Sequence, residues 1–127
     1  MNNDIAIKAA LDVMEAHIVA LNARDEAKIA ATLHFPHIRL SNTDQKTWET
    51  PDSYFADFRI RAGDSWNRSK FHDIQVVRAS DNKVHLDAQI IRYDFNDEVI
   101  TKFRSLWIIT CENGHWAAKF RSSFAPK

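Results

Sequence analysis

The sequence predicts a single α+β domain, in which helices from the N-terminal half pack against an antiparallel sheet from the C-terminal half. Three observations support this. Segments with helical apolar spacing occur only before Gly63. The runs after Lys70 alternate between apolar and polar residues, as strands do. Asn113-Gly114 separates two of these runs and favours a type I′ hairpin turn. At 127 residues the chain has the length of one domain.

The first predicted helix runs from Asp4 to Asn22, and Asn2 or Asn3 is expected to cap it. Its apolar stripe follows i, i+3 or i+4 spacing: Ile7, Leu11, Met14, Ile18 and Leu21. His17 lies beside this stripe. We expect its imidazole either at the boundary with solvent or directed into a pocket lined by the helix.

A second helix is predicted from Asp25 to about Leu33, and Pro36 ends it because the residue before proline avoids the helical region. His34 and His37 flank this proline. No helix can hold both imidazoles across Pro36, so no metal site is predicted. We expect His37 in a surface turn and His34 partly buried.

A short hairpin is predicted from Ile38–Asn42 and Lys46–Glu49. Thr50-Pro51-Asp52 then gives a helix start with an N-cap threonine, proline at the first position and an acid in the first turn. This third helix is expected to run to about Arg61 and to end at Gly63. Its inward residues are predicted to be Tyr54, Phe55, Phe58 and Arg61.

The predicted sheet contains the runs Phe71–Arg78, Lys83–Phe95 and Glu98–Cys111, and the segment after Gly114. A two-residue turn at Asn113-Gly114 gives the pairs Cys111–Trp116, Ile109–Ala118, Trp107–Phe120, Ser105–Ser122 and Phe103–Phe124. A similar turn at Asn96-Asp97 gives Ile90–Phe103, Leu86–Trp107 and Val84–Ile109. Both turns place the same apolar residues on one face, which supports the register. The parity of Phe71–Arg78 stays open.

Composition limits the possible partners. The net charge is zero and the pI is about 7.0, whereas nucleic-acid binding requires a basic excess. Cys111 is the only cysteine, which argues against a disulfide or a cysteine-based metal site. No signal peptide or membrane span is recognised. We therefore expect a soluble cytoplasmic protein with no cofactor, no metal, no nucleic-acid partner and no membrane partner.

The whole chain resembles the nuclear transport factor 2-like superfamily of cystatin-like α+β cones, which includes ketosteroid isomerase-like and polyketide cyclase-like proteins. The resemblance is carried by the long first helix, the break at residues 22–25, Leu33-His34-Phe35-Pro36, and the ending from Asn113-Gly114-His115-Trp116 to Ser122-Ser123-Phe124-Ala125-Pro126. It implies a curved sheet wrapped by three helices, an internal pocket, and dimerisation through the outer sheet face.

The resemblance also bears on catalysis. Many relatives carry alternating histidines on the last strand, whereas this chain has Phe120 and Ser122 at those places. Isomerase-type relatives use a carboxylate base and a donor in an apolar pocket. By position, Asp73 is the candidate base and Tyr54 or His17 the candidate donor.

The first functional hypothesis is a pocket for a small, flat, mostly hydrophobic molecule. Its predicted lining is Phe103, Ser105, Trp107, Phe120, Ser122, Leu86, Ile90, Arg92 and His34. A cavity below roughly 300 Å³ would exclude this hypothesis. The alternatives are a proton-transfer enzyme of isomerase, dehydratase or cyclase type, and a dimeric assembly module without catalysis.

The other face of the sheet mixes aliphatic side chains with charges of both signs, a composition found at protein interfaces. We expect a homodimer at micromolar concentration. The predicted interface residues are Arg104, Leu106, Ile108, Lys119, Arg121, His85, Asp87 and Gln89.

Overall fold

The computed structural model describes residues 3–125, with only the backbone described at residues 61 and 62. The helices are α1 (Asp4–Ala23), α2 (Glu26–Ala31) and α3 (Pro51–Ala62). The strands are β1 (Leu33–Ser41), β2 (Asp44–Trp48), β3 (Arg68–Ala79), β4 (Lys83–Tyr93), β5 (Val99–Glu112) and β6 (His115–Ser123). The predicted α+β class is confirmed.

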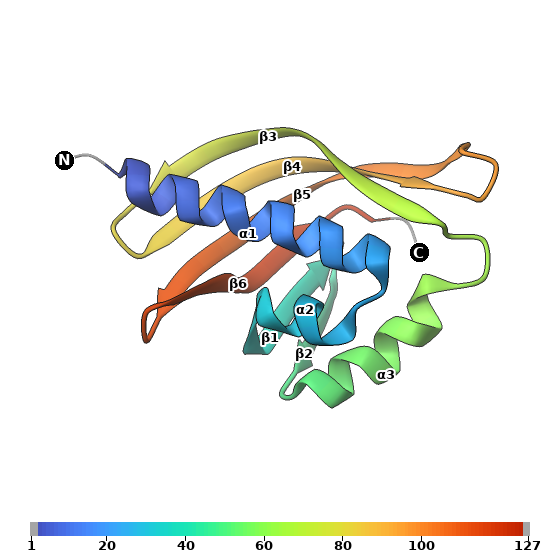
Figure 1. Ribbon diagram of the computed structural model, residues 1–127, viewed down its shortest axis with the longest axis horizontal. Coiled ribbons are helices and arrows are strands. Elements are labelled where there is room, and N and C mark those ends of the chain that lie inside the picture. Colours follow the sequence, from blue (N-terminus) through green and yellow to red (C-terminus); the bar gives the residue numbers. More distant parts are fainter. Residues whose placement is uncertain (1–2, 126–127) are drawn as a thin grey trace.

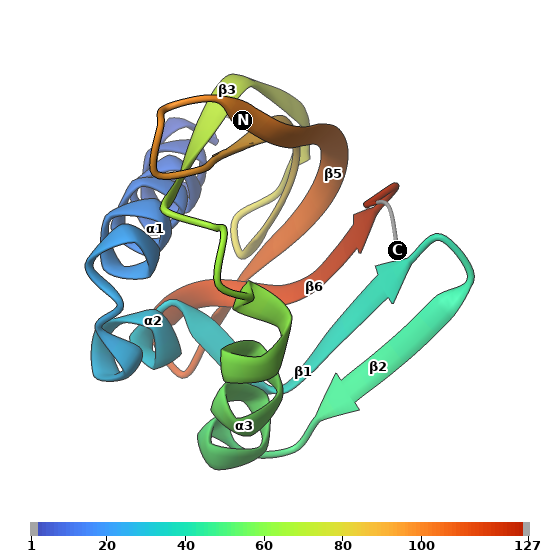
Figure 2. The same ribbon diagram turned by 90° about the vertical axis from the view of Figure 1, so that its right-hand side faces the viewer.

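The six strands form one sheet in the order β2-β1-β6-β5-β4-β3. Figure 1 shows α1 crossing the long strands, with α2 and α3 on the same side of the sheet. In Figure 2 the sheet curls around these helices, so its concave face is directed toward them. The interior of the domain therefore lies between the concave face and the three helices.

One pair of strands departs from the antiparallel prediction. β1 pairs with β6 in parallel, whereas the other neighbouring strands pair antiparallel. This pairing joins the short β1–β2 hairpin to the four predicted antiparallel strands, so that one six-stranded sheet results. The sequence did not reveal it because strands from opposite ends of the chain meet there.

The helices begin much as predicted. Asn3 occupies the N-cap position of α1 without a side-chain cap bond, and Arg24 ends the helix in the left-handed conformation. At α3, the N-cap Thr50 forms a capping box with Ser53, and Pro51 between them is the first residue of the helix. Tyr54 and Phe55 are buried as expected. Asn2 and the side chain of Arg61 lie outside the described residues.

The segment around Pro36 was predicted incorrectly. α2 ends at Ala31 and β1 already begins at Leu33, so residues 33–37 belong to a strand instead of a helix end and a turn. The strand predicted from Ile38 is the continuation of β1. His37 is consequently buried rather than on the surface, and its Nδ1 lies 3.0 Å from the Ala118 carbonyl oxygen. The neighbouring β6 supplies that carbonyl, which explains the error: the pairing partner is distant in sequence.

The hairpin of β5 and β6 begins in the predicted register and then changes it. Cys111 pairs with Trp116 and Ile109 with Ala118, and the tight turn has positive φ at both Asn113 and Gly114. Beyond these pairs, a bulge leaves Lys119 without a direct partner, so Ile108 pairs with Phe120.

The bulge reverses the faces of the last residues. Trp107 pairs with Arg121 and Ser105 with Ser123, instead of Phe120 and Ser122. The prediction that Phe120 and Ser122 face inward is therefore wrong, as is the prediction that Arg121 lies on the outer face. A single extra residue in one strand changes the side chain at every later position.

The register between β4 and β5 is as predicted. Leu86 pairs with Trp107 and Ile90 with Phe103, although the connecting loop is longer than two residues. Leu86 is fully buried and belongs to the hydrophobic core with Met14 of α1. The core therefore lies between α1 and the sheet and extends to Trp48 of β2 and Tyr54 of α3.

Candidate functional site

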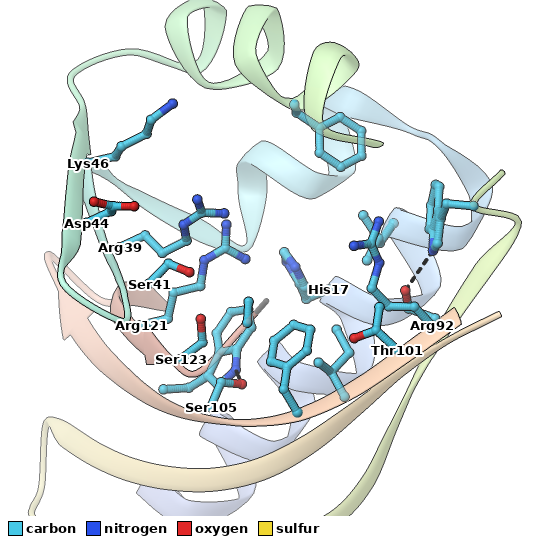
Figure 3. Close-up of a pocket in the computed structure, with 18 of the residues that line it drawn as sticks. His17, Arg39, Ser41, Asp44, Lys46, Arg92, Thr101, Ser105, Arg121 and Ser123 are labelled. Carbon is cyan, nitrogen blue, oxygen red and sulfur yellow. Dashed lines mark hydrogen bonds between the residues drawn. The ribbon is translucent and has the colours of Figure 1, made fainter. Parts of the chain in front are cut away.

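A cavity of about 950 Å³ lies against the concave face of the sheet. Residues from α1, α3 and strands β1 to β6 line it (Figure 3). Its volume is well above the lower limit of roughly 300 Å³ for a small-molecule site. The cavity thus has room for a ligand after the side chains have packed.

Aromatic and aliphatic side chains form much of the cavity wall. Trp107 and Phe103 of β5 lie with Ile90 of β4, while Leu21 and Phe58 come from the helices. The indole N–H of Trp107 donates to Ser105 Oγ at 2.9 Å. Because that N–H is satisfied, the indole contributes its apolar surface to the wall.

Arg121 enters the cavity because of the bulge in β6. Its Nη2 donates to Tyr54 Oη at 3.1 Å, and its Cζ lies 5.3 Å from the ring centroid of Trp107. Its Nε is buried without a hydrogen-bond partner. Within residues 3–125 no carboxylate pairs with this guanidinium. Its position is held by aromatic rings, and its positive charge is not neutralised.

Arg92 carries a second unpaired charge. No hydrogen bond or ion pair joins it to another residue in the described part of the chain. Burial lowers the pKa of Arg92, although a guanidinium stays protonated at neutral pH. Thr101, its pairing partner on β5, has a buried Oγ1 without a hydrogen-bond partner. In Figure 3, Arg92 and Thr101 lie across the cavity from Arg121.

The β1–β2 side of the cavity carries further charges. Arg39, Ser41, Asp44 and Lys46 all line it there (Figure 3). Lys46 forms an ion pair with Asp57 at 2.8 Å. Cationic groups therefore outnumber acidic groups in the cavity lining, although the whole chain has no net charge.

His17 lies at the back of the cavity. Its ring is buried, its Nδ1 is 2.8 Å from Thr32 Oγ1, and it contacts Trp107 edge-on at a centroid distance of 5.1 Å. Burial, and secondarily the positive charge of Arg121, lowers the pKa of His17 to about 3. The imidazole is therefore neutral at physiological pH.

The cavity brings together seven of the predicted site residues. They are His17, Tyr54, Ile90, Arg92, Phe103, Ser105 and Trp107. All seven lie either on helical faces set by apolar spacing or on the β4–β5 pair, where the predicted register is correct.

Asp73 was predicted as a candidate base, but it lies on the opposite face of the sheet. An irregularity in β3 gives it a positive φ of 56°, and its Oδ2 accepts a hydrogen bond from Arg104 Nη1 at 3.3 Å. The carboxylate is exposed and is not part of the cavity. Proton abstraction by Asp73 inside the cavity is therefore excluded by its position.

Four predicted lining residues also lie elsewhere. His34 Nε2 is 2.9 Å from the Thr110 carbonyl oxygen and 3.6 Å from Glu112 Oε2. Leu86 is packed within the core, and the bulge directs Phe120 and Ser122 to the outer face. None of the four lines the cavity.

The main residues missed from the sequence are Arg121 and Ser123 on β6 and Arg39 and Ser41 on β1. The first two require the bulge, which no local motif marks. The second two require the parallel pairing of β1 with β6, in which Arg39 is opposite Arg121 and Ser41 opposite Ser123. The only sequence signal is that Arg39 and Ser41 are two residues apart and would share one face of a strand. This spacing does not say which face is the inner one.

The described residues contain no group of three or more histidine, cysteine, aspartate or glutamate side chains that could hold a metal ion. Within residues 3–125, no helix has the length and apolar character needed to cross a bilayer. The cytoplasmic location stays a prediction.

The curved six-stranded sheet with three helices on its concave face defines an α+β cone. No protein-family model and no curated protein matches the sequence. Solved structures do match, and among them are nuclear transport factor 2-like proteins. The chain therefore has the nuclear transport factor 2-like fold, as its sequence predicted.

Three of these structures illustrate the match. A nuclear transport factor 2-like protein of unknown function from Shewanella oneidensis has a TM-score of 0.76 at 11% identity, covering 93% of this chain and 98% of its own. One from Cytophaga hutchinsonii has a TM-score of 0.74 at 17% identity, covering 99% and 100%. A protein provisionally assigned as a ketosteroid isomerase, from Shewanella frigidimarina, has a TM-score of 0.71 at 11% identity, covering 91% and 94%. Identities this low establish the fold and no activity.

Proposed function

We propose that this protein binds a small organic anion with a flat, mostly apolar body in the cavity. The observation that carries the proposal is the pair of guanidinium groups, Arg92 and Arg121, which line the cavity without carboxylate partners among the described residues. This deepens the pocket hypothesis from the sequence, which anticipated a small, flat, mostly hydrophobic molecule.

The charge of these groups supports an anionic ligand. Removing a cation from water without a counter-charge costs free energy, so such groups are usually paired. Arg121 is fixed by Tyr54 and by the ring of Trp107, and among the described residues its guanidinium donates only this one hydrogen bond, so further donors on its Nη atoms remain for a ligand. A carboxylate is the group that guanidinium donors bind with the most favourable geometry.

The wall of the cavity supports an apolar body. Trp107, Phe103 and Ile90 line it beside the arginines. Ligand sites typically combine such walls with a few placed polar groups. The combination fits an aromatic or branched aliphatic carboxylic acid better than a sugar or a nucleotide.

Binding of benzoate, followed by amide chemical shifts, tests the proposal. Benzoate is expected to perturb amides around the cavity, and the uncharged benzyl alcohol is expected to bind at least about tenfold more weakly. Arg121→Met should weaken benzoate binding by about 10- to 100-fold, because a charged hydrogen bond is lost. Arg104→Met, which removes a guanidinium from the outer face, is the matched control and should have no effect. Equal binding of acid and alcohol would overturn the proposal.

Proton-transfer catalysis is the second candidate, because His17 and Tyr54 both line the cavity. The pKa of His17 limits this role: at about 3, it lies far below the neutral range in which a general base is most effective. Tyr54 accepts a hydrogen bond from Arg121. The geometry therefore favours ligand binding over catalysis by these two residues.

We also propose that two copies associate through the outer face of the sheet. Its aliphatic side chains Ile91, Leu106 and Ile108 are partly exposed in the single chain. Charges of both signs surround them, including the Arg104–Asp87 pair at 3.1 Å. A self-complementary interface needs this combination of apolar surface and balanced charge.

Light scattering distinguishes the two states, since one chain has a mass of 14.7 kDa. Wild-type protein at micromolar concentration is expected to give twice that value. Leu106→Glu should return it to the monomer mass, because a carboxylate would replace an aliphatic contact. Ile60→Glu, at an exposed position on α3, is the control. A monomeric wild type would contradict this proposal and leave the cavity proposal intact.

A further inference from the structure

The hydrogen bonds of His17 determine which ring nitrogen carries the proton. Its Nδ1 lies 2.8 Å from Thr32 Oγ1, and that hydroxyl lies 2.7 Å from the carbonyl oxygen of Ile29. A carbonyl oxygen only accepts, so the single hydroxyl hydrogen of Thr32 is donated to Ile29. Thr32 Oγ1 must then accept its other hydrogen bond, and Nδ1–H of His17 is the donor.

The same assignment gives Nε2 of His17 a lone pair. A neutral imidazole carries one proton, and here that proton is on Nδ1. His17 lines the cavity, and no hydrogen bond to Nε2 is present within residues 3–125. Figure 3 shows the ring between Arg121 on one side and Arg92 on the other. The two arginines offer a ligand only hydrogen-bond donors, whereas this nitrogen offers a ligand only an acceptor.

We propose that Nε2 of His17 accepts a hydrogen bond from a hydroxyl or N–H group of the bound anion. The cavity therefore selects small organic acids that carry a hydroxyl or amino group, above all hydroxylated aromatic acids, over acids without a donor. This inference rests on the proposed binding of organic anions. It adds a second recognition element, an acceptor of fixed tautomer between two cationic donors.

The surroundings of the ring keep the acceptor in place. Thr32 acts as a positioning residue, because its hydroxyl fixes both the tautomer and the ring orientation. Trp107 contacts the ring edge-on and restricts its rotation. Once a ligand fills the cavity, an acceptor left without a partner costs more than the hydrogen bond contributes when formed. A ligand without a donor, or with a methylated oxygen, is thus disfavoured beyond the loss of one contact.

Nitrogen-15 spectroscopy of the imidazoles tests the tautomer without any ligand. At pH 7 the Nδ1 of His17 is expected to have the shift of a protonated ring nitrogen and Nε2 that of an unprotonated one. Thr32→Ser keeps the hydroxyl and should preserve this pattern. Thr32→Val removes it and should give averaged shifts. A proton on Nε2 in the wild type would overturn the inference.

Binding of five aromatic acids tests the selectivity. The probes are 3- and 4-hydroxybenzoate, benzoate, and the matching methoxybenzoates, titrated against amide shifts. The better hydroxybenzoate is expected to bind about tenfold more tightly than its methoxy counterpart. The ratio of these two dissociation constants should stay near ten in Thr32→Ser and fall to about one in Thr32→Val. If Thr32→Val does not fold, His17→Phe provides the same comparison of the two constants.

The outcomes separate this inference from the proposed function. If benzoate binds through Arg121 but the hydroxyl group brings no preference, the inference about His17 fails and anion binding stands. If none of the acids binds at millimolar concentration, both fail together. If hydroxybenzoates are preferred equally in Thr32→Ser and Thr32→Val, the preference arises elsewhere and the role of His17 is wrong.

Discussion

The arginines on the two faces of the central strands have different hydrogen-bond partners. On the outer face, Arg104 donates from Nε to Asp87 Oδ1 at 3.1 Å and from Nη1 to Asp73 Oδ2 at 3.3 Å. These bonds raise the pKa of Arg104, with the hydrogen bond to Asp87 as the largest cause. On the inner face, Arg121 has a tyrosine hydroxyl and aromatic rings, but no carboxylate among the described residues.

This difference indicates on which face the arginine charges are already balanced within the single chain. On the outer face, Arg104 is paired with carboxylates, although its charge is also accessible to water and salt. The inner charges are held in a cavity, where an uncompensated cation is unfavourable and where an incoming anion would gain the most. Residues that break the usual pairing rules in this way tend to mark functional sites.

The largest expected effect concerns His17, the neutral group among the inner cations. The unfolded chain takes up a proton at this residue below pH 6.5, whereas the folded protein does so only near pH 3, where its pKa lies. The unfolded state thus binds more protons across this interval, and stability falls as pH falls, by about 1.4 kcal/mol per pH unit. Between pH 6.5 and pH 4, His17 alone is expected to cost about 3 kcal/mol of the unfolding free energy.

Urea unfolding of wild type and His17→Gln at several pH values measures this effect. The glutamine variant is expected to have the smaller dependence on pH, because residue 17 no longer titrates. The comparison uses the difference between the two proteins, so titration of the carboxylates, common to both, cancels. Identical pH dependences would contradict the buried, neutral state of His17 and weaken the contrast between the faces.

The sequence predicted many of the side chains on the inner face, and the errors in that prediction have a specific cause. Helical spacing predicted that His17 could point into a pocket and that Tyr54 points inward. Turn chemistry fixed the hairpin as far as Ile109 and Ala118. At Lys119 the register changes at a bulge, and from Phe120 onward β6 also pairs with β1, a strand more than seventy residues away in the chain. No turn motif reports such a contact.

The bulge in β6 changes the chemical character of the cavity and therefore the ligand that it can be expected to bind. With Phe120 and Ser122 inward, the predicted lining would have been mostly apolar, with two hydroxyl groups and Arg92 as its one cation. With Arg121 and Ser123 inward, it becomes a cationic cavity. The fold was predictable because many apolar positions indicate it independently, so an error in the prediction of any one of them does not change the result. The chemistry of the cavity rests on a few side chains, so one irregular residue decides it.

The second prediction sharpens the contrast through Arg92. Replacing a partly buried, unpaired guanidinium by an apolar side chain of similar length removes a desolvation penalty. Arg92→Met is therefore expected to raise the unfolding free energy by about 1 kcal/mol at pH 7 while weakening benzoate binding. Thermal and urea unfolding measure the first effect, and titration with benzoate measures the second. A clear loss of stability would mean that Arg92 has a structural role and is not reserved for a ligand.

The smallest effect is expected on the outer face, at Arg104. Its side chain and both of its carboxylate partners are considerably exposed, with side-chain accessibilities of 39% for Arg104, 47% for Asp73 and 39% for Asp87. Exposed ion pairs contribute little to stability because water and salt screen them. Arg104→Met should therefore lower the melting temperature slightly in dilute buffer, and the difference should vanish in about 1 M salt, where the Debye length is roughly 3 Å. The measurement is made on protein dilute enough to be monomeric, so that subunit contacts do not contribute. A large loss of melting temperature that persists at high salt would show that the ion pairs of Arg104 are important for stability. The distinction between an outer face with balanced charges and an inner face with unpaired charges for a ligand would then not hold.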